Sequence, residues 1–147
     1  MIRRISGASL PLFEQAVRQF KGRTSDSTFV EIPGALAYVA VRGEEVLGWC
    51  WGYHLVWPDS SSMAYLHELE VAEEHRREGI GRELLRAFLA AVREASAYKM
   101  FLITDTANAP ARSLCESMGG TLSDQGPTVT YNFSLTAADQ THTDGTH

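Results

Sequence analysis

Apolar residues follow two spacings along this chain, and each spacing predicts a different kind of secondary structure. Apolar positions recur every three or four residues over 9–20 and 79–96, which predicts amphipathic helices in both segments. Apolar runs that alternate with polar residues, or that are rich in β-branched and aromatic residues, predict strands. The expected strands cover residues 2–5, 35–42, 46–56, 64–71 and 100–104.

A third helix and a terminal hairpin complete the predicted elements. The helix is expected to open at Asn108 or at the Ala109-Pro110 step and to stop at Gly119-Gly120. Residues 121–135 predict two final strands, whereas the small, polar residues 136–147 predict a disordered tail. The element order predicts one α/β domain of the α+β type over residues 1–135, with a mixed, mostly antiparallel sheet and helices on both of its faces.

Composition and charge narrow the classes of function. The formal net charge of −5 argues against a nucleic-acid binder, which usually carries a basic face, and favours a cationic small-molecule partner. No apolar run approaches the roughly 20 residues that a membrane span requires, and the start of the chain lacks the apolar core of a secretory signal. The two cysteines have no metal-type spacing and form no disulfide framework. We therefore expect a cytoplasmic protein with no metal site and no membrane partner.

The segment from Arg76 to Arg82 carries the strongest chemical signal. It reads Arg-Arg-Glu-Gly-Ile-Gly-Arg and joins a predicted strand to a predicted helix. Free backbone N–H groups at a helix start, together with the positive end of the helix dipole, bind anions. Gly79 and Gly81 let the backbone approach a phosphate closely, so a diphosphate is the expected guest. The alternative is an ordinary helix with a glycine-rich entrance and a solvated charged face; nicotinamide and Walker fingerprints are both absent.

Two motifs in the correct order resemble those of one family. The pattern Arg76-x-x-Gly79-x-Gly81, after a strand that ends Leu69-Glu70-Val71, resembles the acetyl-CoA motif of Gcn5-related N-acetyltransferases (GNAT). The run Asn108 to Gly119 resembles the second motif of that family. The resemblance implies the GNAT fold, in which a bulged strand opens a V-shaped splay between the two central strands, and it implies acetyl-CoA as the cofactor. Within the family, residues 65–81 are most similar to class I aminoglycoside 3-N-acetyltransferases.

The resemblance also implies where acetyl-CoA would bind. The pyrophosphate would contact backbone N–H groups from Arg77 to Arg82, and the pantetheine arm would bind beside Leu69 and Val71 like an added strand. A backbone N–H near Leu69 or Glu70 would face the thioester carbonyl. The residues expected to contact the cofactor are Leu69, Glu70, Val71, Arg76, Arg77, Glu78, Gly79, Ile80, Gly81, Arg82, Asn108 and Cys115.

Glu68 is the expected general base, because an acceptor ammonium must lose a proton before its nitrogen can attack. It matches the acidic position of the aminoglycoside enzymes and would lie just before the bulge; the alternative is a surface carboxylate. Glu70 would share its face in a regular strand but not across a bulge. His67 could be the base instead, although its neighbours predict a packed, core-facing row. Asp105 is expected either to hold a cationic acceptor together with Glu68 or to be a turn residue.

Two features depart from a simple family match. Family members commonly carry a tyrosine where this chain has Cys115, and that tyrosine is thought to protonate the leaving thiolate; Cys115 is either a weaker donor or a packing residue. An aromatic series with odd-numbered spacing occupies one predicted strand and the turn after it. It predicts core or interface packing, or else a surface that stacks sugars or joins a dimer. The series consists of Trp49, Trp51, Tyr53 and Trp57.

The expected activity is acetyl transfer to the 3-amino group of an aminoglycoside antibiotic, which would make this a resistance enzyme. Alternatives within the enzyme class are acetylation of a polyamine, another small amine or a protein amine. Outside that class, the same fold could be a non-catalytic acyl-CoA sensor, or the glycine loop alone could bind a nucleotide phosphate. A homodimer is expected because dimers are common in the family.

Overall fold

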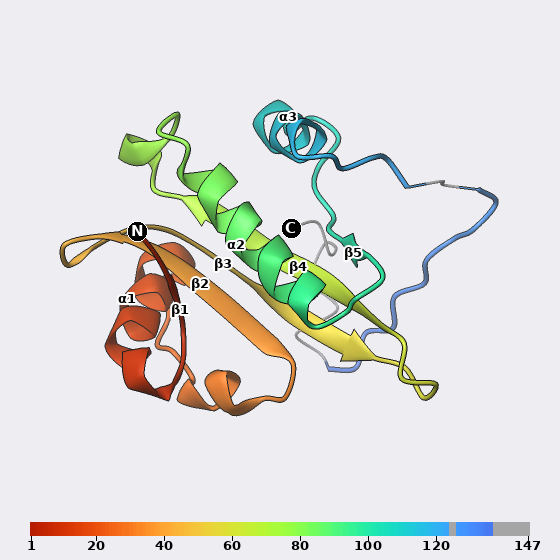
Figure 1. The fold of residues 1–147 in the computed structure, drawn as a ribbon, viewed down its shortest axis with the longest axis horizontal. Coiled ribbons are helices and arrows are strands. Elements are labelled where there is room, and N and C mark those ends of the chain that lie inside the picture. Colours follow the sequence, from red (N-terminus) through yellow and green to blue (C-terminus); the bar gives the residue numbers. More distant parts are fainter. Residues whose placement is uncertain (124–125, 137–147) are drawn as a thin grey trace. The chain divides into compact units, whose positions relative to one another are not determined.

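The computed structural model describes residues 1–123 and 126–136, which group into two compact units, 1–102 and 103 onward. The first unit contains one five-stranded sheet with the order β1-β2-β3-β4-β5 (Figure 1). Neighbours from β1 to β4 are antiparallel, and β5 is parallel to β4. The strands are β1 (Ile2–Arg4), β2 (Ala35–Arg42), β3 (Glu45–Val56), β4 (Ser62–Val71) and β5 (Met100–Phe101).

Two helices cover opposite faces of this sheet, α1 (Leu10–Lys21) and α2 (Ile80–Glu94). Adjacent residues of β3 show the two faces: a Cβ at Gly48 would lie 3.2 Å from the Leu84 side chain of α2, whereas the Trp49 ring stacks on Phe20 of α1 at 5.7 Å. Period-2 alternation on the strands therefore supplies both helices with an apolar surface. The mixed, mostly antiparallel sheet with helices on both faces confirms the predicted fold class.

Helix boundaries and burial follow from the sequence pattern. Helix α1 has Pro11 in its first turn and ends at Gly22, whose φ of 66° is the left-handed conformation that glycine tolerates best. Helix α2 buries Leu84 and Phe88 completely, and each such side chain stabilises the fold by roughly 1.5–3 kcal/mol. Three short 3-10 helices complete the unit: η1 (Gly7–Ser9), η2 (Ser27–Glu31) and η3 (Glu73–His75).

The second unit contains α3 (Ala109–Ser117), as predicted, with Asn108 at its N-cap. The predicted terminal hairpin is wrong for residues 121–123 and 126–136, to which the structure assigns no strand. Alternate apolar residues suggested strands, but a strand needs a pairing partner and a surface to cover its apolar side. In the structure the alternating side chains are between 76% and 84% exposed; they are Val129, Tyr131, Phe133 and Leu135.

Strand β5 is shorter and more exposed than expected, with two residues in place of five and a Phe101 side chain that is 38% exposed. The predicted tail spans 136–147, of which 137–147 lie outside the described residues. No helix among the described residues is both long enough and apolar enough to cross a membrane.

Candidate active site

The segment between β4 and α2 forms an anion cradle, defined as residues 76–82. Arg77 has a φ of 68° and Gly79 a φ of 82°, and Gly79 is the N-cap residue of α2. Two left-handed residues so close together bend the backbone sharply into the helix. The N–H groups of Ile80 and Gly81 open the helix and have no helical carbonyl four residues before them, and no atom would lie within 4 Å of a Cβ at Gly79. The cradle thus has the open backbone that phosphate binding requires.

Arginine side chains add positive charge to the cradle, and one of them also joins it to β4. The Arg76 Nε donates to the Val71 carbonyl oxygen at 3.3 Å. Arg77 and Arg82 follow on either side of the glycine turn. A diphosphate would therefore encounter both backbone donors and guanidinium groups here.

The β2–β3 hairpin supports the cradle through four charged side chains. Glu78 is exposed but reaches the hairpin, where its Oε1 accepts from Arg42 at 3.1 Å. His75 lies between two carboxylates, with Nε2 2.9 Å from Glu45 and Nδ1 3.2 Å from Glu78. The bond to Glu45, and then that to Glu78, raise the pKa of His75. The Arg42 guanidinium and then His75 lower the pKa of Glu78. We call these four residues the hairpin tie.

The edge of β4 opens just before it reaches the cradle. Strand β5 pairs with β4 only at Ala64–Met100 and Tyr65–Phe101, although β4 continues to Val71. From Leu66 to Val71, therefore, the structure pairs β4 with β3 alone. This is the splay that the GNAT resemblance implies, and it leaves a strand edge to which an extended ligand can add.

A bulge on β4 places two carboxylates side by side. Gly52 pairs with Leu66 and Trp51 pairs with Glu68, so His67 is the extra residue. The bulge therefore comes before Glu68, and the prediction that Glu68 precedes it is wrong. Beyond the bulge the strand is regular, so Glu68 and Glu70 lie on the same face of the sheet. Their partners Trp51 and Trp49 lie on this face too, which is the one that packs against α1.

Glu68 is already held by two donors. Its Oε1 accepts from the Lys21 ammonium at 3.0 Å and from the Trp51 indole N–H at 3.3 Å, and its side chain is 16% exposed. Partial burial of Glu70, and then its hydrogen bond to Glu68, raise the pKa of Glu70. The two carboxyl groups thus form one acidic cluster with a single lysine bound to it.

An aromatic wall stands beside this acidic cluster. The rings of Trp51 and His67 are 4.5 Å apart, Tyr65 stacks on Phe101 at 4.7 Å, and Trp51 meets Tyr53 edge-on. The predicted row is right for His67 and Tyr65, whose hydroxyl is 2.7 Å from Nδ1, but wrong for Leu69, because the bulge moves Leu69 to the opposite face. Leu69 pairs with Cys50 on the α2 side.

The predicted aromatic series divides between the interior and the surface. Trp49 is 3% exposed beneath α1, which confirms core packing for that residue. Trp51 and Tyr53 continue the same face and contact Phe29 of η2. Trp57 lies past the end of β3 and is 41% exposed.

Three predicted site residues belong to the second unit. The Asp105 carboxylate accepts from the Ala107 N–H at 2.7 Å, as expected of a turn residue. Asn108 caps α3 by accepting from the Ala111 N–H at 3.1 Å. Cys115 is half-buried, and burial raises the pKa of its thiol.

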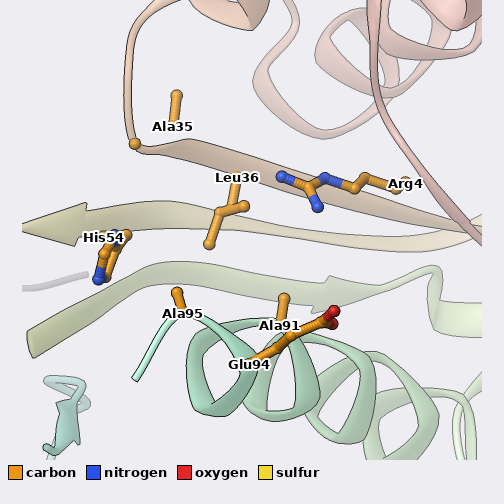
Figure 2. Close-up of a pocket in the computed structure, with 8 residues that line it drawn as sticks. Arg4, Ala35, Leu36, His54, Ala91, Glu94 and Ala95 are labelled. Atoms are coloured by element: carbon orange, nitrogen blue, oxygen red, sulfur yellow. The ribbon is translucent and has the colours of Figure 1, made fainter. Parts of the chain in front are cut away.

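A hollow of about 320 Å³ lies at the other end of α2 from the cradle (Figure 2). The helix spans about 20 Å at 1.5 Å per residue, so the two sites are distinct. Arg4 and Glu94 bring opposite charges to this hollow from β1 and α2. None of the predicted site residues lines this hollow. Among residues 1–123 and 126–136 no cluster of side chains could hold a metal ion.

Comparison with known proteins establishes the class. The sequence pattern of the acetyltransferase (GNAT) family matches residues 8–119, and the chain belongs to this family. No curated protein gives a significant match. Among solved structures, an aminoglycoside acetyltransferase from an uncultured soil metagenomic sample, meta-AAC0020, was solved with sisomicin; it is 23% identical, with a TM-score of 0.80 over 92% of this chain and 96% of its own.

Two further solved structures share the fold. The aminoglycoside acetyltransferase HMB0005, also from a soil metagenomic sample, is 21% identical, with a TM-score of 0.78 over 92% of this chain and 98% of its own. AAC(6')-Iy, solved with the bisubstrate analogue CoA-S-monomethyl-acetylneamine, is 15% identical, with a TM-score of 0.75 over 90% of this chain and 97% of its own. At these identities the likeness concerns the fold.

Sequence reasoning missed the residues that support the site from a distance. Arg42 and Glu45 face each other across the hairpin end, and only their charge beside a basic segment offered a signal. Lys21 is 47 residues from Glu68, and no pattern in the sequence connects them.

Proposed function

We propose that this protein transfers the acetyl group of acetyl-CoA to the 3-amino group of an aminoglycoside antibiotic. The observation that carries the proposal is the pair Glu68 and Glu70 on one face of β4, beside an open strand edge that leads into an anion cradle. One end of this strand can thus hold a phosphorylated donor while its middle holds a cationic acceptor. Membership of the GNAT family supports the acyl-transfer chemistry.

The cradle residues would hold the pyrophosphate of acetyl-CoA. The backbone N–H groups between Arg77 and Arg82 would be the donors, and the Glu78 side chain, bound to the hairpin, would keep that backbone in place. The pantetheine arm would add to β4 at Leu69 and Val71, where β5 no longer pairs. Acetyl-CoA supplies an acetyl group activated as a thioester.

The residues of β4 would carry the chemistry. Glu68 would take the proton of the acceptor ammonium, which frees the nitrogen lone pair for attack. A backbone N–H at Leu69 or Glu70 would stabilise the negative charge that develops on the carbonyl oxygen. The site would hold amine and thioester in contact, which removes much of the entropic barrier. A thiol with a pKa near ~8.5 can depart without a strong acid, so a cysteine at position 115 is compatible with turnover.

An aminoglycoside suits the acidic cluster and the aromatic wall better than a monoamine does. Glu70 offers further carboxylate oxygens to a polycation, and Tyr65 and Trp51 offer apolar faces to sugar rings. The net charge of −5 would attract such a substrate. The sisomicin complex of meta-AAC0020 supports the same acceptor class.

The proposal is tested by release of free coenzyme A from acetyl-CoA with a panel of amines: gentamicin, sisomicin, kanamycin, spermidine and a lysine peptide. We expect turnover with the aminoglycosides, a product acetylated at the 3-amino group by NMR, and reduced susceptibility in a bacterial host that expresses the protein. Glu68→Gln should lower kcat roughly 10²–10⁴-fold with little change in the KM for acetyl-CoA.

Glu14→Gln is the matched control, because Glu14 is an exposed carboxylate on α1. Turnover with spermidine or the peptide alone would keep the acetyltransferase activity but would show that the acceptor is not an aminoglycoside. Binding of coenzyme A without turnover of any amine would indicate an acyl-CoA sensor instead.

A further inference from the structure

Lys21 brings a primary amine of the protein itself to the proposed base. It is the last residue of α1, and the chain turns away immediately after it through Gly22. Its Nζ lies 3.0 Å from Glu68 Oε1, and its side chain is 45% exposed. The Trp51 N–H donates to the same oxygen at 3.3 Å. Lys21 thus occupies the position relative to Glu68 that an acceptor ammonium must take.

We propose that Lys21 is a substrate of this enzyme, acetylated within its own molecule when acetyl-CoA is bound and no acceptor is present. The inference rests on the proposed function, because it uses Glu68 as the base. It adds a modification site that lies outside both sequence motifs.

The step balances as an ordinary amide-forming transfer. The Lys21 ammonium gives one proton to the Glu68 carboxylate, and the freed nitrogen attacks the thioester carbonyl carbon. A carbon–nitrogen bond forms, the carbon–sulfur bond breaks, and coenzyme A leaves as the thiolate, which takes up a proton. The second ammonium proton passes to solvent. The products are Nε-acetyl-lysine at position 21 and free coenzyme A, with no oxidant or reductant involved.

The location of Glu68 favours this reaction. The last pair between β4 and β5 is Tyr65–Phe101, so Glu68 lies three residues beyond the point where the β4 edge becomes open. The thioester of a pantetheine arm added to that edge would lie beside Glu68. An amine bound to Glu68 is thus next to the electrophile, and the proton acceptor is already in contact.

The chain supplies its own control, because Lys21 and Lys99 are its only lysines. The Lys99 ammonium lies 5.7 Å from the centre of the Tyr98 ring, and no carboxylate among the described residues pairs with it. The N-terminal amine donates to the Val41 carbonyl oxygen at 3.0 Å. Of these amines, Lys21 is the one that the structure pairs with Glu68.

Acetylation would change the acceptor site as well as the lysine. The amide carries no charge, so the ion pair to Glu68 is lost and the protein becomes one unit more negative. An arriving polycation would then find Glu68 without a competing ammonium. Before modification, by contrast, the acceptor must displace Lys21.

The test incubates the purified full-length protein with acetyl-CoA alone and follows its intact mass and its peptide map. The variants are Lys21→Arg, Lys99→Arg and Glu68→Gln, beside wild type. We expect wild type and Lys99→Arg to gain one acetyl group at Lys21, at a first-order rate that does not depend on protein concentration. Lys21→Arg should gain none. Glu68→Gln should react roughly 100-fold more slowly, and sisomicin should suppress the modification by competition.

Two results would overturn the inference alone. One is an unmodified Lys21 in protein that acetylates sisomicin under the same conditions, which leaves the proposed function intact. The other is equal labelling of Lys21 and Lys99, or an unchanged rate in Glu68→Gln, which indicates uncatalysed acetylation. Absence of both Lys21 modification and sisomicin turnover, with coenzyme A bound, would overturn the inference and the proposed function together.

Discussion

Glu68 and Glu70 extend from the same face of β4, and the extra residue His67 lies before both of them, not between them. The two carboxyl groups are therefore close enough to interact. Burial of Glu70, and then its hydrogen bond to Glu68, raise the pKa of Glu70. Lys21 neutralises part of this cluster. The bulge thus puts both carboxylates on the same face as Tyr65, whereas a regular strand would have placed them on the opposite face.

Replacing Glu70 should stabilise the fold at neutral pH. The pKa of Glu70 is raised above its ordinary value of 4.5, so its contribution to stability is fully present below that pH and is lost as pH rises through the higher folded-state pKa. At neutral pH the fold must therefore hold an ionised Glu70 carboxylate at a free-energy cost, which Glu70→Gln removes. We expect a Tm a few degrees higher than wild type at pH 7, with the difference vanishing in acid. Thermal unfolding of both proteins from acid to pH 7 measures the difference in Tm. A lower Tm for the variant at pH 7 would contradict the argument.

Affinity for coenzyme A should fall with rising pH because of the hairpin tie. The pKa of His75 is raised above 6.5 by Glu45 and Glu78. The stabilisation from its charged form is therefore complete below 6.5 and is lost as pH rises through the folded-state value. Glu45→Gln removes the largest cause of the shift, and it should move the midpoint of the affinity change to lower pH.

Isothermal titration of coenzyme A at a series of pH values around and above 6.5 would measure the shift in the midpoint of the affinity change. Glu44→Gln is the control, because Glu44 is the exposed neighbour of Glu45 in the same turn. The comparison also cancels titration of the ligand's own phosphate. Identical midpoints for the two variants would show that the tie does not govern the cradle.

Gly52 should not tolerate a side chain. A Cβ there would overlap the Tyr65 carbonyl oxygen and would lie 2.9 Å from Leu66 Cα and 3.0 Å from the Phe88 ring. Backbone at the bulge cannot move aside without loss of the strand register. Gly52→Ala should therefore destabilise the protein by about 3 kcal/mol, measured by urea unfolding.

Gly7→Ala provides the comparison for that measurement, because no atom would lie within 4 Å of its Cβ. Its effect should stay within about 0.5 kcal/mol. Equal effects of the two substitutions would show that the bulge backbone is more adaptable than its contacts suggest.

The two thiols should react at very different rates. Burial raises the pKa of Cys50 to about 12, and its side chain is fully buried beside the Leu84 carbonyl. Cys115 is partly exposed, although burial also raises its pKa. Native protein should therefore titrate one thiol with a disulfide reagent, slowly, and the second only after unfolding. Cys115→Ser should abolish the reaction of native protein with the reagent. A native Cys115→Ser protein that still reacts would show that Cys50 is more accessible than its burial indicates.

The long elements were predictable because local pattern and tertiary burial agree in them. Residues 35–41 are a continuous apolar run in an interior strand that is buried on both faces, and the apolar side of 79–96 meets that sheet directly. The cradle was predictable for the same reason: glycine spacing, helix start and positive charge are neighbours in sequence. These features need no knowledge of distant contacts.

The unpredicted features depend on pairings between distant residues. The bulge arises from the way β3 meets β4, and nothing in residues 65–70 alone distinguishes His67 from Glu68 as the extra residue. The ion pair of Lys21 with Glu68 depends on the end of α1 reaching β4. At residues 128–135 the alternation suggested strands, but the structure provides no sheet edge that pairs with them.

The hairpin tie also decides where the protein can be modified for use. The Gly43-Glu44 turn is exposed and lies far in sequence from the cofactor motif, so it looks like a convenient place to insert a fluorescent tag or an affinity peptide. An insertion there would separate Arg42 from Glu45 and release Glu78 and His75 together. The turn at Asp59 to Ser61, closed by its own hydrogen bonds, has no such link to the cradle. A reporter placed in that second turn would leave cofactor binding undisturbed.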